Sequence, residues 1–255
     1  MNYIKKIAEK GLWNSGKAQL WDFARANQNE ESRVEAVATV ASICYGRPAK
    51  DAAKLVERLW SESGGLPSSA FEFIRDGRSP TIEGSLRNNP DLVPYENDPS
   101  ESAEALIERH RKSIATFRIK VPIFVARQIM RHRQFSYQEL SRRYTDDKRV
   151  PLDFWIPAEG GDTETATTGL FQLAYTLEKQ IYRLLLDSNV RADIARAVLG
   201  TGLYTELWMM GDQEAWRNYF ALRLDPHTQV EHREMAQVMR DLLAEHQPEF
   251  AMQSP

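Results

Sequence analysis

The stretch that decides the fold is residues 121–144, VPIFVARQIMRHRQFSYQELSRRY. It begins with apolar residues and ends with many hydrogen-bond donors. Pro122 suits the first turn of a helix, where its missing N–H costs nothing. Ile123, Ala126 and Met130 follow at helical spacing and are expected to face a core. The stretch therefore predicts a buried helix whose last turn and following loop enter a pocket for an anionic ligand.

The polar side of this stretch carries the donors. Gln128, Arg131 and His132 lie three or four residues apart and share one side of the helix. The following polar residues are Arg133, Ser136, Glu139, Ser141, Arg142 and Arg143. A phosphate needs several fixed donors, and the planar fork of arginine suits it best. The alternative is that these arginines form surface ion pairs with nearby carboxylates.

Two individual residues extend these expectations. The positive charges on both sides of His132 favour its neutral ring, which can then stack on a cofactor or form a hydrogen bond with it. Ser141 lies in no nucleophile-elbow pattern, so its hydroxyl is expected to donate to a ligand. The sequence contains neither a glycine-rich dinucleotide fingerprint nor a P-loop.

The composition bounds the class of protein. The 255 residues are 42% hydrophobic and carry a net charge of −3, so no general attraction to nucleic acid is implied. Cys44 is the one cysteine, which excludes an internal disulfide framework and favours a reducing compartment. No apolar run reaches membrane-spanning length, and the start lacks a secretion signal. These features predict a cytoplasmic protein that binds neither membrane nor nucleic acid.

Hydrophobic periodicity predicts a mostly helical chain with a few strands, which indicates an α+β fold. Besides the helix that starts at 122, the expected helices cover 32–42, 49–60, 100–110, 163–188, 191–199 and 213–222, with a last helix from 225. The expected strands cover 114–121 and 201–210. Ser32 and Asp212 are expected helix caps. We expect one domain over 1–255, with an N-terminal extension over about 1–31, an insertion over about 74–111 and a loose tail from 247.

Two other chemistries are not favoured. His227 and His232 are five residues apart, so they do not share a helix face as a metal-binding i, i+4 pair does. We therefore expect no metal. Cys44 has no basic neighbour in ASICYG and is expected to be a small buried hydrophobe and not a nucleophile.

The arginine-rich stretch resembles a known signature. Arg131-His132-Arg133, seven further residues, Ser141 and then Arg143-Tyr144 are similar to the motif of the flavin-dependent thymidylate synthases. The resemblance resumes at DIAR (193–196), LYT (203–205) and AWRNYFALRLDPH (215–227). It covers 112–245 well and 32–73 loosely.

This resemblance implies a reaction and an assembly. Members of the family convert dUMP to dTMP with methylenetetrahydrofolate as the one-carbon donor. Reduced FAD supplies the hydride, and NADPH reduces the flavin. The family forms homotetramers with a small antiparallel sheet in each chain and with active sites shared between subunits.

The resemblance also implies roles for residues. Arg223 matches an arginine that contacts the uracil carbonyl and favours the ionised ring, which is its expected catalytic role. The positions matching dUMP-binding residues are Gln128, Arg131, Glu139, Leu140, Ser141, Arg142, Arg143 and Arg196. The positions matching FAD-binding residues are Ser69, Glu72, Arg131, His132, Arg133, Glu139, Asn218 and His227.

The chain departs from the family pattern at several positions. Ser69 and Glu72 lack the two histidines that usually accompany them. Glu214 stands where an arginine is frequent, Arg142 where glycine is usual, and Gln138 where asparagine is usual. These changes keep two alternatives open: a diverged enzyme that forms, for example, a hydroxymethyl deoxypyrimidine nucleotide, or a non-catalytic nucleotide-binding protein.

Overall fold

The structure is a computed structural model, and it describes residues 4–23, 25, 30–46, 114–157 and 164–250. The predicted helices over 49–60 and 100–110, the expected insertion over 74–111, and Ser69 and Glu72 lie outside these residues. The described strands are β1 (Lys5–Leu12), β2 (Gly16–Asp22), β3 (Ile114–Pro122), β4 (Ser136–Glu139) and β5 (Tyr204–Asp212). The described α-helices are α1 (Glu30–Tyr45), α6 (Ile123–Ile129), α7 (Glu164–Asp187), α8 (Ala192–Ala195), α9 (Gln213–Arg223) and α10 (Val230–His246), and short 3-10 helices cover Arg196–Val198 and Pro248–Phe250.

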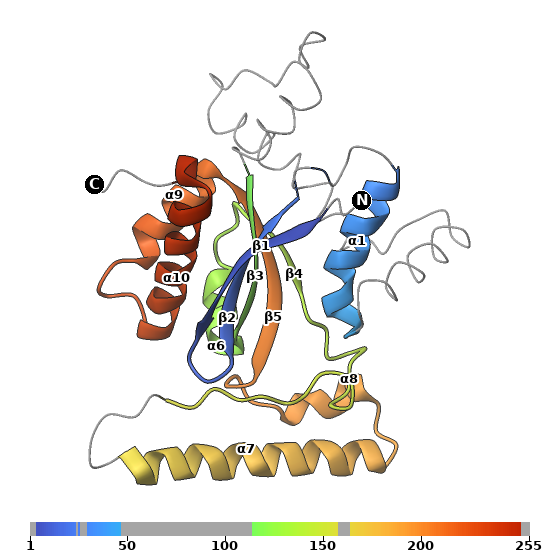
Figure 1. The fold of residues 1–255 in the computed structure, drawn as a ribbon. Helices are drawn as coiled ribbons and strands as arrows, with labels where there is room; N and C mark the ends of the chain where they lie inside the picture. Colours follow the sequence, from blue (N-terminus) through green and yellow to red (C-terminus); the bar gives the residue numbers. More distant parts are fainter. Residues whose placement is uncertain (1–3, 24, 26–29, 47–113, 158–163, 251–255) are drawn as a thin grey trace.

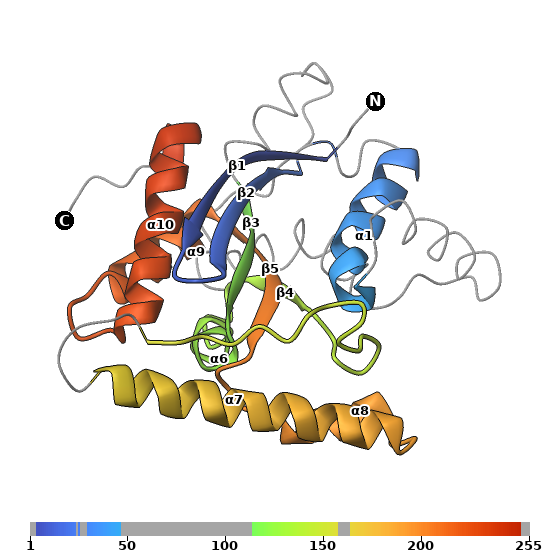
Figure 2. The same cartoon turned by 60° about the horizontal axis from the view of Figure 1, so that its bottom comes forward.

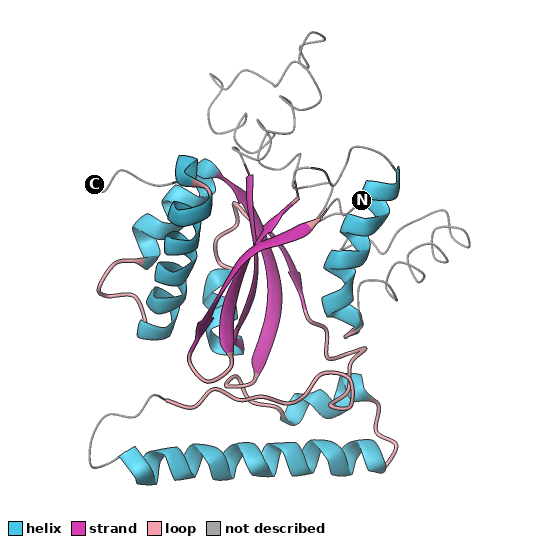
Figure 3. Ribbon diagram, viewed as in Figure 1, coloured by secondary structure: helices cyan, strands magenta, loops and turns pink. Residues whose placement is uncertain are grey.

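The described strands form one antiparallel sheet in the order β1-β2-β3-β5-β4 (Figures 1 and 3). The longest described pairing joins β3 to β5, from Ile114 opposite Asp212 to Pro122 opposite Tyr204. The predicted strand over 114–121 is confirmed, and the strand predicted over 201–210 is observed over β5. A helix-rich chain around an antiparallel sheet confirms the α+β prediction.

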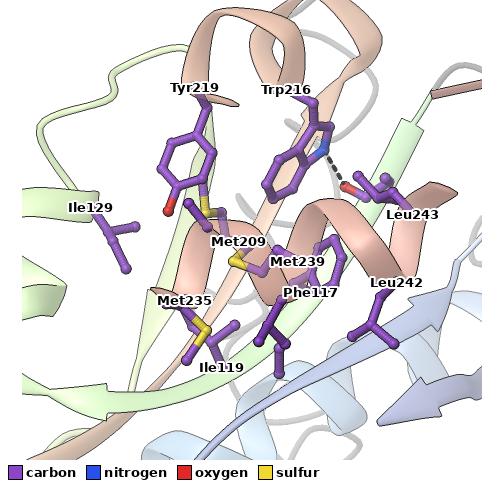
Figure 4. Close-up of a cluster of buried hydrophobic side chains, with 14 of the residues drawn as sticks. Phe117, Ile119, Ile129, Met209, Trp216, Tyr219, Met235, Met239, Leu242 and Leu243 are labelled. Carbon is purple, nitrogen blue, oxygen red and sulfur yellow. Dashed lines mark hydrogen bonds between the residues drawn. The ribbon is translucent and has the colours of Figure 1, made fainter. Parts of the chain in front are cut away.

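Alternation along β5 gives the sheet two buried faces. Leu207 and Met209 point into the larger hydrophobic cluster, with residues from α6, α9 and α10. Trp208 and Met210 point to the opposite face, where they pack with α1. Figure 1 shows α9 and α10 on one side of the sheet and α1 on the other, and Figure 4 shows Phe117, Met209 and Trp216 within the larger cluster. The sheet is therefore the middle layer of the described structure.

A third cluster joins α7 and α8 to one end of the sheet. Phe154 pairs with Leu203 through an isolated bridge, and both side chains are buried with Tyr182 of α7. Figure 2 shows α7 lying across the ends of the central strands. The predicted amphipathic helix over 163–188 is thus confirmed. None of the described helices combines the length and apolar content needed to cross a membrane.

The second face of α7 is apolar and exposed. Leu170, Leu173, Leu177, Ile181 and Leu184 are between 46% and 68% exposed. These residues recur at helical spacing and form one stripe, which we call the α7 stripe. Tyr182 and Tyr175 belong to the other side of the helix, where they pack against the rest of the chain. The helix therefore has a docked face and a free apolar face in the single chain.

The N-terminal hairpin was not predicted from the sequence. β1 and β2 pair with each other, and β2 extends the sheet by pairing with β3. In the hairpin turn, the Trp13 indole donates to Glu234 at 2.7 Å, and the Asn14 amide donates to the Phe154 carbonyl at 3.1 Å. Much of the expected extension over 1–31 therefore belongs to the same sheet as β3.

Several predicted boundaries were wrong. Ser32 lies inside α1 and is buried, so it does not cap that helix. The last helix begins at Val230 and not at 225, because Asp225 organises a turn that accepts hydrogen bonds from the backbones of His227 and Thr228. The tail from 247 is not loose as far as 250, since Gln247 and Phe250 are buried.

Asp212 caps α9 as predicted, because its carboxylate accepts a hydrogen bond from the Ala215 backbone at 2.8 Å. Replacing it by alanine leaves that N–H without a cap. We expect Asp212→Ala to lower the free energy of unfolding by about 1 kcal/mol. Asp212→Asn, which retains a capping oxygen, should stay within a few tenths of that of the wild type. Urea denaturation followed by circular dichroism measures both, and equal losses would contradict the capping role.

Candidate functional site

The segment after α6 is held in place by β4. The Tyr137 hydroxyl on β4 donates to the carbonyl oxygens of Ile129 and His132, at 2.9 and 3.0 Å. Phe135 packs edge-on against Trp216, with ring centroids 4.7 Å apart. A Cβ at Gly211 would lie 2.5 Å from the Phe135 ring, so this close approach requires glycine. These contacts fix the turn that carries the Arg-His-Arg sequence.

The centre of the candidate site is a hydrogen bond between two residues 91 positions apart. Arg223, at the end of α9, donates from Nε to Nε2 of His132 at 2.7 Å. The His132 ring also lies edge-on to Tyr219, with centroids 4.9 Å apart. The structure therefore joins the expected catalytic arginine to the expected flavin-binding histidine.

This hydrogen bond requires a neutral His132 with its proton on Nδ1, because Nε2 must accept. Burial first, and then the positive charge of Arg223, lower the pKa of His132 to about 4. From the sequence, the neutral state of the His132 ring was predicted to result from the positive charges of Arg131 and Arg133. The structure instead gives burial and Arg223 as the causes.

A second histidine, missed as a site residue by sequence reasoning, lies behind this pair. The buried His232 of α10 contacts the Tyr219 hydroxyl through Nε2 at 3.1 Å and the Gln128 amide oxygen through Nδ1 at 3.3 Å. The Gln128 amide nitrogen in turn donates to Gln229. Burial first, then Arg223 and His132, lower the pKa of His232 to about 3. The contacts therefore join five side chains into one group: Arg223, His132, Tyr219, His232 and Gln128.

Glu139 forms a second part of the site, at the end of β4. Its carboxylate accepts a hydrogen bond from the Thr205 hydroxyl at 2.8 Å. Burial raises the pKa of Glu139, while Thr205 and the charges of Arg127 and Arg196 act in the opposite direction. Arg127, which the sequence did not single out, thus belongs to this electrostatic environment with the predicted Arg196.

The loop after Glu139 contains the other expected nucleotide-binding residues. Leu140 is buried. The guanidinium of Arg142 is also buried and donates to the carbonyl oxygens of Val150 and Pro151, so this side chain closes the loop on itself. The Ser141 hydroxyl accepts from the Arg143 backbone at 3.4 Å, and the exposed Arg143 guanidinium lies over the Tyr144 ring. Of the two arginines of this loop that were expected to bind the nucleotide, Arg143 is therefore the one that is exposed to an anion.

The remaining expected flavin-binding residues are spread along the same region. Arg131 and Arg133 are exposed. The Asn218 amide donates to the Gln134 side chain at 3.3 Å. α9 therefore lies next to the turn that carries Arg131 and Arg133. His227 is not joined to this group, because its ring pairs with Asp225 and its side chain is 96% exposed. Within the residues that the structure describes, no group of acidic, histidine or cysteine side chains has the arrangement of a metal site.

The fold and this group of side chains define an α+β protein with a cationic site at the junction of α6, β4 and α9. The family model described as "Thymidylate synthase complementing protein" matches residues 109–249. The chain is 33% identical over 179 residues to a flavin-dependent thymidylate synthase of Pseudothermotoga lettingae, covering 65% of this chain and 79% of that protein. It is also 35% identical to the enzyme of the same name from Kosmotoga olearia, over 48% of this chain and 59% of that protein, and 30% identical to that of Synechocystis sp., over 53% and 68%.

The chain therefore belongs to the thymidylate synthase complementing protein family, that of the flavin-dependent thymidylate synthases. This confirms the family resemblance of the Arg-His-Arg motif.

The low pKa of His232 predicts acid sensitivity. Below pH 6.5 the unfolded chain gains a proton at this position, while the folded chain stays neutral down to about pH 3. Stability therefore falls as pH drops through this window, by at most about 2 kcal/mol between pH 6.5 and 5 for one such group. Urea titrations at pH 7 and pH 5 should show this loss, and His232→Phe should show a smaller one. An unchanged pH dependence in the variant would contradict the prediction.

Proposed function

We propose that this protein transfers a one-carbon unit from methylenetetrahydrofolate to dUMP and, with reduction by FADH2, gives dTMP, with NADPH as the reductant of the flavin. The names of the relatives support thymidylate synthesis with a flavin. The single observation that carries the proposal is the hydrogen bond from Arg223 to a neutral His132.

That hydrogen bond prepares Arg223 for a substrate. A guanidinium has five N–H donors, and His132 accepts only the one on Nε. The two terminal nitrogens keep their donors for a uracil carbonyl. A fixed positive charge there stabilises the negative charge that develops on the pyrimidine ring, which makes carbon-5 nucleophilic. A neutral His132 lets Arg223 approach without charge repulsion.

The nucleotide phosphate fits the loop after β4. Arg143 is exposed there and the Ser141 hydroxyl lies beside its backbone. Arg142 orders the loop through Val150 and Pro151 and is expected to contribute through its backbone. Arg196 adds positive charge near Glu139. Fixed N–H and O–H donors of this kind are what a phosphate requires.

The residues present also fit a flavin. The exposed guanidinium groups of Arg131 and Arg133 suit a negatively charged pyrophosphate, and Gln134 and Asn218 carry amides beside them. When bound, the reduced flavin supplies the hydride, and the protein contributes binding, orientation and electrostatics. The flavin-binding roles of His227, Ser69 and Glu72 stay predictions, as does the cytoplasmic location.

We further propose that copies of the chain assemble as a homotetramer with sites shared between subunits. The α7 stripe supports an assembly, because five large apolar side chains at helical spacing are exposed on one helix. Contiguous apolar patches of this kind mark interaction surfaces in soluble proteins. The charge on each copy is modest, at −3, and does not oppose association.

Replacing Arg223 tests the proposed chemistry. We expect Arg223→Ala to lower kcat for dTMP formation by about 100-fold or more, as loss of one transition-state donor does. The exposed Arg217 on the same helix gives a matched control, and Arg217→Ala should retain near wild-type turnover. Chromatography of the nucleotide products measures both. Near-normal turnover by Arg223→Ala would exclude the proposed role.

The same product analysis decides between the proposed reaction and its alternatives. Formation of dTMP from dUMP supports the proposal. A hydroxymethylated nucleotide would indicate the diverged enzyme, and dUMP binding without any product would indicate a non-catalytic protein. Glu214, which motivated these alternatives, is exposed in the first turn of α9, where a negative charge is favourable to the helix.

A charge in the α7 stripe tests the assembly. We expect Leu177→Glu to reduce the oligomer at micromolar concentration, because burying an unpaired carboxylate is costly. Gln172→Glu introduces the same side chain at an exposed polar position of α7 and should leave the assembly intact. Light scattering coupled to size-exclusion chromatography gives the mass of each variant. A tetramer unaffected by Leu177→Glu would place the interface elsewhere.

A further inference from the structure

His232 occupies an unusual position for a histidine that belongs to none of the motifs of the site. Its side chain is completely buried (0% exposed) in α10, yet both ring nitrogens have polar partners. One partner is the Tyr219 hydroxyl, and the other is the amide of Gln128 on α6. The ring therefore links Tyr219, on the buried side of α9, to Gln128, which is expected to bind the nucleotide.

The donors and acceptors of this connection can be assigned. The Gln128 amide oxygen can only accept, so Nδ1 of His232 carries the proton and donates to it at 3.3 Å. The other nitrogen, Nε2, then accepts from the Tyr219 hydroxyl at 3.1 Å. Tyr219 is itself buried and its ring packs on Trp216 and Phe220, so the hydroxyl is held in place.

From this arrangement we propose that His232 is a positioning residue that fixes which end of the Gln128 amide faces the nucleotide. The inference rests on the proposed function. The two ends of an amide have nearly the same shape but opposite hydrogen-bonding character. With its oxygen held by His232, Gln128 has its NH2 group on the other end. Gln229 takes one N–H of that group, and the second N–H remains for an acceptor.

The consequence is selection for an acceptor on the ligand. The pyrimidine carbonyls and the phosphate of dUMP are acceptors, so the fixed amide matches them. A flipped amide would present its oxygen and would leave such a ligand atom without a donor, which is the costly case for a buried polar group. His232 does no acid–base work in this role, since burial and the charge of Arg223 keep it neutral at working pH.

Three substitutions of His232 test the proposal. Phenylalanine keeps the ring but removes both polar contacts. The side-chain NH2 of asparagine can occupy the position of the histidine Nδ1 and donate to Gln128. The longer glutamine side chain places its NH2 at the position of Nε2 instead. We expect His232→Phe to raise the KM for dUMP about tenfold, the effect of roughly one hydrogen bond. His232→Asn should stay within about threefold of the wild type, and His232→Gln should resemble the Phe variant. Flavin affinity, measured by fluorescence titration, should change less than twofold in all three.

A double-mutant cycle separates positioning from general packing. Gln128→Met removes the amide, so adding His232→Phe to it should raise the KM for dUMP no further. Additive effects, or an Asn variant weaker than the Gln variant, would overturn the inference. If His232→Phe does not fold, the same comparison is made with Asn and Gln.

The outcomes also distinguish this inference from the proposed function. Direct binding of dUMP, measured by calorimetry, needs no turnover. Binding by the wild-type protein without dTMP formation would exclude the proposed function alone. A cycle without coupling would exclude the positioning role alone, and absence of dUMP binding by the wild-type protein would exclude both.

Discussion

The pairing of β3 with β5 is the constraint on which the site depends. Its register places Pro122 opposite Tyr204, where α6 begins, and Ile114 opposite Asp212, where α9 begins. The two strands are antiparallel, so the starts of these helices lie at opposite ends of the sheet. β4 then pairs with β5 from Ser136 opposite Met210. The chain must therefore travel back along the sheet between Pro122 and Ser136, and this return path delivers His132 to Arg223.

The local elements of this arrangement were predictable because each has a local signal. The strand over 114–121 alternates apolar with polar residues, and Asp212 is a side chain that caps helices well. The helix over 163–188 has a long, regular apolar stripe. β1 and β4 lack such signals. β1 is mostly exposed along its length, and β4 has four residues within a polar run, so their pairing partners define them as strands.

The sequence predicts the residues of the candidate site and not their arrangement. The Arg-His-Arg motif and the family resemblance named His132, Gln128 and Arg223, but a hydrogen bond across 91 residues has no signature in local spacing. His232 shows the same limit. Its spacing from His227 bears on metal binding and does not indicate its contacts with Tyr219 and Gln128. Arg142 shows the converse. An arginine in a loop is typical of an anion-binding site. Only the structure shows that the Arg142 guanidinium donates to the carbonyl oxygens of Val150 and Pro151 instead.

The two faces of α7 link the loop after β4 to the assembly proposed for the chain. The docked face packs on Leu152 and Phe154, which follow that loop, and Arg183 forms an ion pair with Asp147 inside it at 2.6 Å. The opposite face carries the α7 stripe. An association that buries the stripe stabilises the helix by mass action, and the helix stabilises the loop. In the proposed assembly, the specific activity per chain would therefore depend on dilution, even though the loop makes its own contacts within one subunit.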